Sequence, residues 1–333
     1  MWYIDFGPSG DVVLSSRVRL ARNIENLPFG DRMSDLQRDE VVEKCKKAIP
    51  DFKYIDLKAM SHEEKAALAE CHIISPNMVK NEGRPALLTN DDCTTSVLLN
   101  EEDHIRIQAM TSGFNLDECL EKANETDNKI EESVDYSFDE TFGYLTCCPT
   151  NTGTGMRASV MVHLPALTES GRMEGIVRSI SKIGLTVRGI FGEGSKAAGN
   201  IYQISNQVTL GVSEQEIIER LKHVTNEIIM QERDLGVKIY NENKFRFEDR
   251  VMRSFGVLTN AVIISSGEAM NLISDVRWGV NMGIIKNIDL TKINELIYEI
   301  LPGGIVKKYN LTDATERDLK RAEILRNGLG KMI

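Results

Sequence analysis

The chain has 333 residues, of which 41% are apolar and 27% are charged, and its formal net charge at pH 7 is −10. This length suffices for one large domain or two ordinary ones, and the composition is typical of a soluble globular protein. The acidity argues against a nucleic-acid or membrane-surface binder, so an anionic ligand would need local clusters of arginine.

The first predicted strand carries a pair of arginines. Residues 11–20 read as a strand on which Arg17 and Arg19 point to the same side. Such a pair usually marks an exposed edge, but it also suits phosphate oxygens. Downstream, residues 35–48 fit an amphipathic helix, and a capping box at Ser61 opens a helix to about Cys71.

His72 ends that second helix. A lone histidine there is more often a partner of the helix dipole than of a ligand. Residues 86–110 then predict strands on both sides of the acidic junction Asn100-Glu101-Glu102-Asp103-His104. The alternating pattern after it puts Arg106 on one face with Gln108 and beside the acids. An isolated Glu-Glu-Asp turn is most often a solvent-exposed turn without a function. A functional role for these acids therefore depends on arginines elsewhere in the chain.

A glycine-rich loop follows an acidic helix at 116–133 and a turn-like segment at 135–142. Residues 144–164 read as a strand, this loop, and then an apolar strand or helix. The loop contains G-x-G-x-x-A, a weak dinucleotide signal without the expected acid about 20 residues on, and no P-loop lysine. Its glycines indicate close backbone approach, and residues 151–157 could wrap phosphates with N–H groups and Arg157.

The remaining chain changes from mixed structure to helix. We expect a helix at 173–183, a strand at 185–191 with Arg188, a lid-like loop at 189–199 and a strand-like segment at 200–210. Ser213 caps a helix to about Leu235, and residues 245–333 look almost wholly helical, so we place a domain boundary near 240. Asp313 caps the last helix, where Arg317 and Arg321 fit a salt-bridged surface helix.

Cysteines, histidines and the N-terminus carry no further motif. The six cysteines and five histidines show neither C-x-x-C nor H-E-x-x-H spacing, so we expect reduced thiols and no protein-built metal site. The N-terminal residues lack the features of a signal peptide, and no apolar run is long enough to span a bilayer. A cytoplasmic protein is therefore expected.

Arginines recur in predicted strands and loops. If they converge, they would form a clamp that stabilises the charge on a transferring phosphoryl group. A phosphoryl transferase built this way would use arginines alone, without a P-loop or the protein-kinase motifs. The five arginines concerned are Arg17, Arg19, Arg106, Arg157 and Arg188.

Four segments at 15–19, 100–106, 148–158 and 188–193 together resemble the ATP:guanidino phosphotransferases, the superfamily of creatine and arginine kinases. Within it the chain is most similar to the bacterial protein-arginine kinases, for two reasons. Small-molecule guanidino kinases carry a helical domain before the first arginine motif, whereas only fourteen residues precede it here. The segment Arg317-Asp-x-x-Arg-Ala322 also matches the phosphoarginine-binding motif of that group.

The resemblance implies an α+β fold in which residues 1–240 form the catalytic domain, with a central, mainly antiparallel β-sheet flanked by helices. Residues 241–333 would form a helical C-terminal domain. The implied activity transfers the γ-phosphoryl group of Mg·ATP to arginine side chains of proteins. The implied partners are protein substrates, an activator protein and an AAA+ unfoldase–protease used in stress control, with a homodimer expected and no direct contact to nucleic acid or membrane.

The resemblance also implies roles for individual residues. Glu102 would be the general base, Cys148 the reactive cysteine near the guanidinium and Glu193 a second carboxylate for the substrate. Phosphoarginine would bind at Arg317, Asp318, Arg321 and Ala322. The nucleotide would be bound by Ser15, Ser16, Arg17, Val18, Arg19, His72, Arg106, Arg157, Ala158, Ser159, Val160, Met161, Arg188, Gly189, Ile190, Phe191, Gly192 and Glu193.

The chemistry is consistent with these roles. A guanidinium has a pKa of about 13.8 and is a poor nucleophile until it loses a proton. A carboxylate can orient the guanidinium through a pair of hydrogen bonds and accept that proton. In-line transfer does not need Cys148 as a nucleophile, although a thiolate near the substrate cation would be favourable.

Two alternatives stay open: a kinase of a free small guanidine, and a phosphoarginine-binding adaptor with an inactive kinase site.

Overall fold

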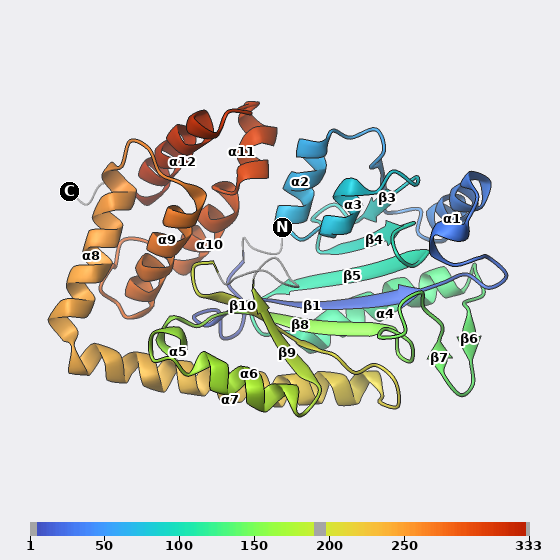
Figure 1. The fold of residues 1–333 in the computed structure, drawn as a ribbon, viewed down its shortest axis with the longest axis horizontal. Coiled ribbons are helices and arrows are strands. Elements are labelled where there is room, and N and C mark those ends of the chain that lie inside the picture. Colours follow the sequence, from blue (N-terminus) through green and yellow to red (C-terminus); the bar gives the residue numbers. More distant parts are fainter. Residues whose placement is uncertain (1–4, 190–197, 331–333) are drawn as a thin grey trace.

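A computed structural model describes residues 5–189 and 198–330 of the chain. In these residues eight strands form one antiparallel sheet in the order β2-β3-β4-β5-β1-β8-β10-β9 (Figure 1). The predicted α+β fold with an antiparallel sheet is therefore confirmed. The strands are β1 Val13–Arg22, β2 Lys53–Asp56, β3 Ala86–Thr89, β4 Thr95–Leu99, β5 Ile105–Ser112, β8 Met156–His163, β9 Leu185–Gly189 and β10 Ile201–Asn206.

Helices surround this sheet, and the C-terminal ones form a group of their own at one end of the molecule (Figure 1). A helical C-terminal region is thus confirmed as well. The helices are η1 Gly30–Arg32, α1 Asp35–Ala48, α2 His62–Glu70, α3 Pro76–Lys80, α4 Leu116–Glu131, α5 Pro165–Glu169, α6 Met173–Ser181, α7 Glu214–Glu242, α8 Lys244–Asn260, α9 Ser266–Asn281, α10 Leu290–Glu299, α11 Pro302–Tyr309 and α12 Ala314–Leu329.

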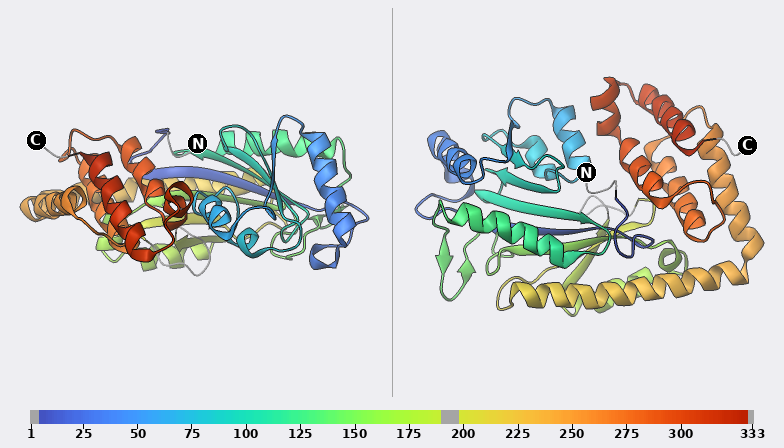
Figure 2. Two further views of the ribbon diagram at one scale, coloured as in Figure 1. Left: turned by 90° about the horizontal axis from the view of Figure 1, so that it is seen from above. Right: turned by 180° about the vertical axis from the view of Figure 1, so that it is seen from behind.

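The side chains of the central strand β1 point alternately to an apolar, buried face of the sheet and to a polar face. Figure 2 shows α4 lying across one face of the sheet, seen from behind. Val18 and Leu20 on β1 share one hydrophobic core with Cys119 and Ala123 of α4. Because side chains alternate along a strand, the intervening arginines of β1 point to the face that α4 leaves uncovered.

Most predicted helix starts are confirmed by their caps. The capping boxes at Ser61 and Ser213 are both formed, and Asp313 accepts hydrogen bonds from the first turn of α12. The apolar segment after the glycine-rich loop, left open as strand or helix, is the strand β8. The segment 135–142 is more than a turn, because it contributes to a small hairpin of β6 Phe138–Asp139 and β7 Gly143–Tyr144.

Helix α7 runs past its predicted end at Leu235 to Glu242. Gly236, directly after that predicted end, lies buried inside the helix. A Cβ there would sit 3.4 Å from Nε1 of Trp278 and 3.9 Å from Cβ of Ala166, which are ordinary packing distances, so the surroundings do not require a glycine at this position. The predicted domain boundary near 240 would fall in the last turn of α7, and it stays a prediction.

Buried polar contacts connect the C-terminal helices to the sheet. Arg277 on α9 donates to the carbonyls of Gly10 and Asp11 at 2.7 and 2.8 Å, and its guanidinium lies 3.0 Å from Nδ1 of His163 on β8. Glu70 at the end of α2 accepts hydrogen bonds from the backbone of Gly303 at the start of α11. The helices of the described chain include none long and apolar enough to cross a membrane.

Glu232 on α7 should give the protein a measurable pH dependence. Its carboxylate accepts from the N–H groups of Ala166 and Leu167 at 2.8 and 2.9 Å, and burial raises its pKa from the ordinary 4.5 to about 7. Between these values the folded state binds more protons than the unfolded chain, so the free energy of unfolding falls as pH rises. Urea unfolding from pH 5 to 8 should show this slope in the wild type and a flatter one in Glu232→Gln. Equal slopes would contradict the assignment.

Candidate active site

A cavity of about 530 Å³ lies on the face of the sheet that α4 leaves uncovered. The arginines that the sequence singled out all line it, together with Glu102, Cys148 and His72. Strands β1, β5, β8, β9 and β10 contribute side chains, as do the segment after α2 and the glycine-rich loop. The lining residues that matter below are Arg17, Arg19, His72, Ser75, Glu101, Glu102, Arg106, Gln108, Cys148, Thr150, Arg157, Arg188 and Gln203.

The sheet register brings the arginines together. Arg19 on β1 lies opposite Arg157 on β8, although like charges in such a pair repel. Arg17 is held in place by its neighbours, since its Nε donates to Oγ of Ser159 at 3.3 Å and its Nη2 to Oε1 of Gln203 at 3.1 Å. Neutral partners thus orient the guanidinium and leave its charge uncompensated.

This crowding changes the acidity of the guanidinium groups. Burial, followed by the charges of Arg106 and Arg157, lowers the pKa of Arg17 to about 10. Burial and the neighbouring arginines also lower the pKa of Arg19, whose buried Nε has no hydrogen-bond partner in the described chain. A polyanion such as a nucleotide triphosphate would supply both the missing acceptor and the missing negative charge.

The three acids of the junction have different environments. The Glu101 side chain is 2% exposed, forms an ion pair with Arg106 and accepts a hydrogen bond from Oγ of Ser75. Asp103 is 1% exposed and bonded to other protein groups. The Glu102 side chain is 41% exposed, lines the cavity and lies 3.4 Å from Nη2 of Arg106. Glu101 also lines the cavity, but its carboxylate is buried and bound to Arg106 and Ser75, so Glu102 has the most exposed carboxylate of the three.

The same environment makes Glu102 a better proton acceptor. Burial raises the pKa of Glu102, the nearby Arg106 lowers it, and the charges of Asp103 and Glu101 raise it again, with a net increase. A raised pKa strengthens a carboxylate as a base while it can still ionise near neutral pH.

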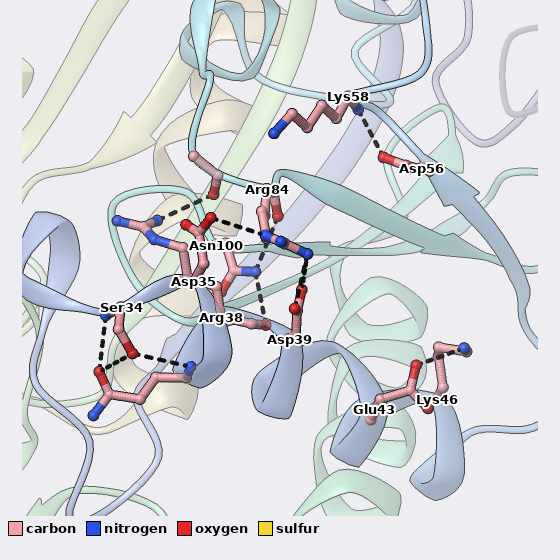
Figure 3. A network of polar contacts seen from close by, with 12 residues as sticks. Ser34, Asp35, Arg38, Asp39, Glu43, Lys46, Asp56, Lys58, Arg84 and Asn100 are labelled. Atoms are coloured by element: carbon pink, nitrogen blue, oxygen red, sulfur yellow. Dashed lines mark hydrogen bonds and ion pairs between the residues drawn. The ribbon is translucent and has the colours of Figure 1, made fainter.

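A network at the start of the junction holds it in place (Figure 3). Asn100 has a left-handed backbone with φ of 59°, and its Nδ2 donates to the carbonyls of Arg38 and Arg84 at 3.1 and 3.0 Å. Arg84 in turn forms an ion pair with Asp39 at 2.6 Å. Helix α1 and the segment before β3 thus fix the turn from which Glu101 and Glu102 project.

Replacing Asn100 separates the two contributions of this residue. Glycine adopts the left-handed conformation without strain but loses both side-chain hydrogen bonds, so Asn100→Gly should lower the free energy of unfolding by about 1–2 kcal/mol. Asn100→Ala adds the strain of the positive φ and should lose about 1 kcal/mol more. Urea unfolding measures both, and a glycine variant as stable as the wild type would contradict the role of the amide.

His72 lies at the back of the arginine cluster in an unusual conformation. Its φ is 58°, its carbonyl accepts from Nε2 of Gln108 at 2.7 Å, and its ring meets Tyr298 of α10 edge-on at 6.3 Å between centroids. Burial, and then Arg17 and Arg19, lower its pKa to about 3. The ring is therefore neutral near pH 7, which argues against the alternative of a charged partner for the helix dipole.

The glycine-rich loop carries Cys148 to the cavity. The Cys148 Sγ lies 3.0 Å from Oγ1 of Thr150. Gly153 and Gly155 have φ of 114° and 63°, and a Cβ would lie 2.2 Å from the carbonyl oxygen of Thr209 and 2.5 Å from that of Ala21, respectively. The close approach that these glycines predicted is thus to the protein's own backbone.

Comparisons with known proteins agree with this geometry. Residues 33–235 match the model of the ATP:guanido phosphotransferase C-terminal catalytic domain, and residues 244–333 match that of the protein-arginine kinase McsB C-terminal domain. The chain belongs to the ATP:guanido phosphotransferase family.

Relatives of this guanido phosphotransferase span its whole length. A protein-arginine kinase of Caldanaerobacter subterraneus is 47% identical over 330 residues, covering 96% of this chain and 98% of the relative. The protein-arginine kinase of Bacillus subtilis is 46% identical over 338 residues, covering 98% and 93%.

Solved structures of guanidino kinases share the fold. A lombricine kinase aligns with a TM-score of 0.62 at 28% identity, covering 70% of this chain and 69% of its own. The duplicated taurocyamine kinase of Schistosoma mansoni, bound to components of a transition-state analogue, gives 0.62 at 29% identity, covering 69% of this chain and 34% of its own.

Some of the predicted nucleotide residues of this guanido phosphotransferase support the cavity without lining it. Ser16 is buried, and its Oγ donates to the carbonyl of Gly113 at 2.9 Å. Ser159 contacts Arg17, as described above. Predicted residues that are likewise buried and do not line the cavity are Ser15, Val18, Ala158, Val160, Met161 and Gly189. Ile190, Phe191, Gly192 and Glu193 lie outside the described residues, as does most of the predicted lid.

Other supporting residues had no clear signal in the sequence. Gln108 shares a strand face with Arg106, so its position was predictable, but its bond to the carbonyl of His72 was not. Ser75 before Pro76 is a helix N-cap, which gives no hint that its hydroxyl also bonds to Glu101. Gln203 reaches Arg17 across 186 positions of sequence, and no local pattern indicates such a contact.

The predicted phosphoarginine motif lies at the start of α12. Arg321 is buried, and its guanidinium donates to the carbonyls of Ile300 and Ile264 at 2.8 and 3.0 Å and pairs with Asp318. Arg317 is half-buried and donates to the carbonyl of Thr312, while Ala322 is buried. The ordinary interpretation of a salt-bridged surface helix is therefore wrong for Arg321, which joins three elements of the helical region.

Proposed function

We propose that this chain is a protein-arginine kinase, which transfers the γ-phosphoryl group of ATP to arginine side chains of proteins. The observation that carries the proposal is a cavity lined by five arginines and by two carboxylates, of which Glu102 is exposed and Glu101 is buried against Arg106. The full-length relatives named protein-arginine kinase support the choice of a protein as the acceptor.

The arginines act on the nucleotide. The uncompensated charge of Arg17 and Arg19, with Arg106, Arg157 and Arg188 around it, binds the triphosphate and stabilises the charge that spreads over the transferring group. Arg17 is already oriented by Ser159 and Gln203, and Arg106 by Glu101, so little reorganisation of these groups accompanies transfer.

Glu102 acts on the acceptor. Its carboxylate orients the substrate guanidinium and accepts one proton from the attacking nitrogen, which forms a bond to the γ-phosphorus while the bond from phosphorus to the β-phosphate oxygen breaks. The products are phosphoarginine and ADP. Cys148 lines the same cavity and interacts with the substrate cation without forming a covalent bond.

Mg²⁺ is expected with the nucleotide. In the part of the chain that the structure describes, no group of three or more His, Cys, Asp or Glu side chains could hold a metal ion. The ion would therefore be held mainly by phosphate oxygens and water, and it would neutralise charge on the phosphates. Glu101 and Glu102 are the carboxylates of the cavity lining that could contribute to holding it.

The wider role is also a proposal. The family resemblance favours a cytoplasmic homodimer that marks proteins for an AAA+ unfoldase–protease in stress control, with an activator protein. Arg317, Asp318, Arg321 and Ala322 would then bind phosphoarginine in regulation, which requires the contacts of Arg321 to rearrange or the ligand to bind beside them.

The decisive experiment compares acceptors. The full chain is incubated with Mg·ATP and a basic protein rich in arginine, the same protein with lysine at those positions, or free arginine. Acid-labile phosphate bonded to nitrogen should be detected by ³¹P NMR only with the arginine protein. Transfer only to free arginine would favour a small-guanidine kinase, and phosphoarginine binding without turnover would favour an adaptor.

A further inference from the structure

Asp103 connects the two chain segments that carry Glu102 and Cys148. It follows Glu102 directly, and its Oδ1 accepts a hydrogen bond of 2.8 Å from the backbone N–H of Cys147. The carboxylate is buried and does not line the cavity, so it cannot reach a substrate. The proposed mechanism uses Glu102 and Cys148 but gives no role to Asp103.

Asn23, just after β1, joins the same cluster. Its Nδ2 donates to the same Oδ1 of Asp103 at 2.8 Å and to the carbonyl of Leu145 at 3.0 Å, while its Oδ1 accepts from the N–H of His104 at 2.9 Å. The ring of His104 in turn accepts from the N–H of Ile24 at 3.0 Å. The end of β1, the acidic junction and the loop before Cys148 are thus connected by buried side chains.

The charge on Asp103 calls for an explanation. Its Oδ2 is buried and has no hydrogen-bond partner among the described residues, and burying a carboxylate with one oxygen unsatisfied is unfavourable. The charge does strengthen the bonds that Oδ1 accepts, because charge-assisted hydrogen bonds are shorter and roughly twice as strong as neutral ones. The residue therefore favours a fixed distance between the two segments at some cost to stability.

We infer that Asp103 is a positioning residue, which fixes the Glu102 carboxylate and the Cys148 thiol on either side of the place where the substrate guanidinium binds. The inference rests on the proposed function, because it assigns that place to the guanidinium. Displacing the Glu102 carboxylate or the Cys148 thiol by about 1 Å would lower the rate of transfer about 100-fold, as for other misplaced catalytic groups.

The test uses Asp103→Ala, with Asp103→Asn as the conservative variant that keeps an oxygen acceptor. Asp275→Ala is the control, because Asp275 on α9 likewise accepts a hydrogen bond from another segment, from Oγ of Ser254 on α8 at 2.8 Å, and forms an ion pair with Arg250, but does not line the cavity. We expect Asp103→Ala to lower kcat about 100-fold with the KM for ATP within about twofold. Asp103→Asn should restore most of kcat, and Asp275→Ala should leave it unchanged.

A second measurement does not depend on turnover. The rate at which iodoacetamide alkylates Cys148, followed by peptide mass spectrometry, should change severalfold in Asp103→Ala and stay at the wild-type value in Asp275→Ala. Should Asp103→Ala not fold, Asn23→Ala removes the other half of the cluster and should show the same two effects.

Two results would overturn the inference: wild-type kcat and alkylation in a folded Asp103→Ala, or losses no larger than those of Asp275→Ala. A wild-type protein that phosphorylates no arginine would instead refute the proposed function. The alkylation rates would still show whether Asp103 positions the loop of Cys148.

Discussion

Glu102→Gln is expected to lower the rate of phosphoryl transfer about 1,000-fold while nucleotide affinity stays within about twofold. Glutamine keeps the size of the side chain and one oxygen acceptor but cannot take a proton from the acceptor guanidinium. The arginines that bind the triphosphate are unchanged. Initial rates with Mg·ATP and an arginine-rich protein measure the first effect, and nucleotide titration measures the second.

The pH profile gives an independent test of the same assignment. Because Glu102 must be ionised to act as a base, kcat/KM of the wild type should fall as the pH drops through the raised pKa of this group. The residual rate of Glu102→Gln should lack that acidic limb. Glu140→Gln, which changes an exposed acid in the turn of the β6–β7 hairpin, is the control and should keep both rate and profile.

Glu101→Gln should behave differently, although it is the adjacent residue. Glu101 is buried, pairs with Arg106 and bonds to Ser75, so its loss should misalign Arg106 and weaken nucleotide binding as well as transfer.

A Glu102→Gln enzyme with wild-type transfer would show that another group removes the proton.

Local patterns predicted the parts of the site that depend on local geometry. The alternation of β1 placed Arg17 and Arg19 on one face, because a period of two is a property of any strand. The caps at Ser61 and Ser213 were predictable for a similar reason, since the capping side chain and its partner lie within one turn of helix. The family resemblance added that Arg106, Arg157 and Arg188 would bind the same nucleotide, and all three line the cavity.

What could not be predicted depends on contacts between distant segments. The two Oδ1 bonds of Asp103 cross 80 and 44 positions of sequence, and the N-terminal and C-terminal neighbours of Asp103 give no sign of them. The predicted end of α7 near Leu235 came just before Gly236, a weak helix former, but the helix continues through that residue to Glu242. The family resemblance had already singled out Glu102 among the three adjacent acids, but their different burial could not be predicted from spacing.

Arg19→Met is expected to make the ligand-free protein more stable and less active at the same time. Arg19 is partly buried beside Arg17, Arg106 and Arg157, burial and their charges lower its pKa, and its Nε has no hydrogen-bond partner in the described chain. Methionine has a similar length and no charge, so the repulsion and the desolvation of one cation are both relieved. The free energy of unfolding should rise by about 1 kcal/mol, as when other buried charges are replaced by apolar side chains.

The same substitution should weaken the binding of ATP phosphates. Added Mg·ATP raises the Tm of a protein that binds it in the folded state, so the wild type should show a shift that largely disappears in Arg19→Met. Arg253→Met is the matched control, because Arg253 on α8 is highly exposed and pairs with Asp249 in its own helix, so both Tm values should stay close to the wild type. Loss of the ATP shift together with a lower Tm without nucleotide would contradict this account, because it would mean that Arg19 stabilises the fold. A gain in stability combined with loss of the shift would show that the arginine cluster is maintained for its ligand at the expense of the empty protein.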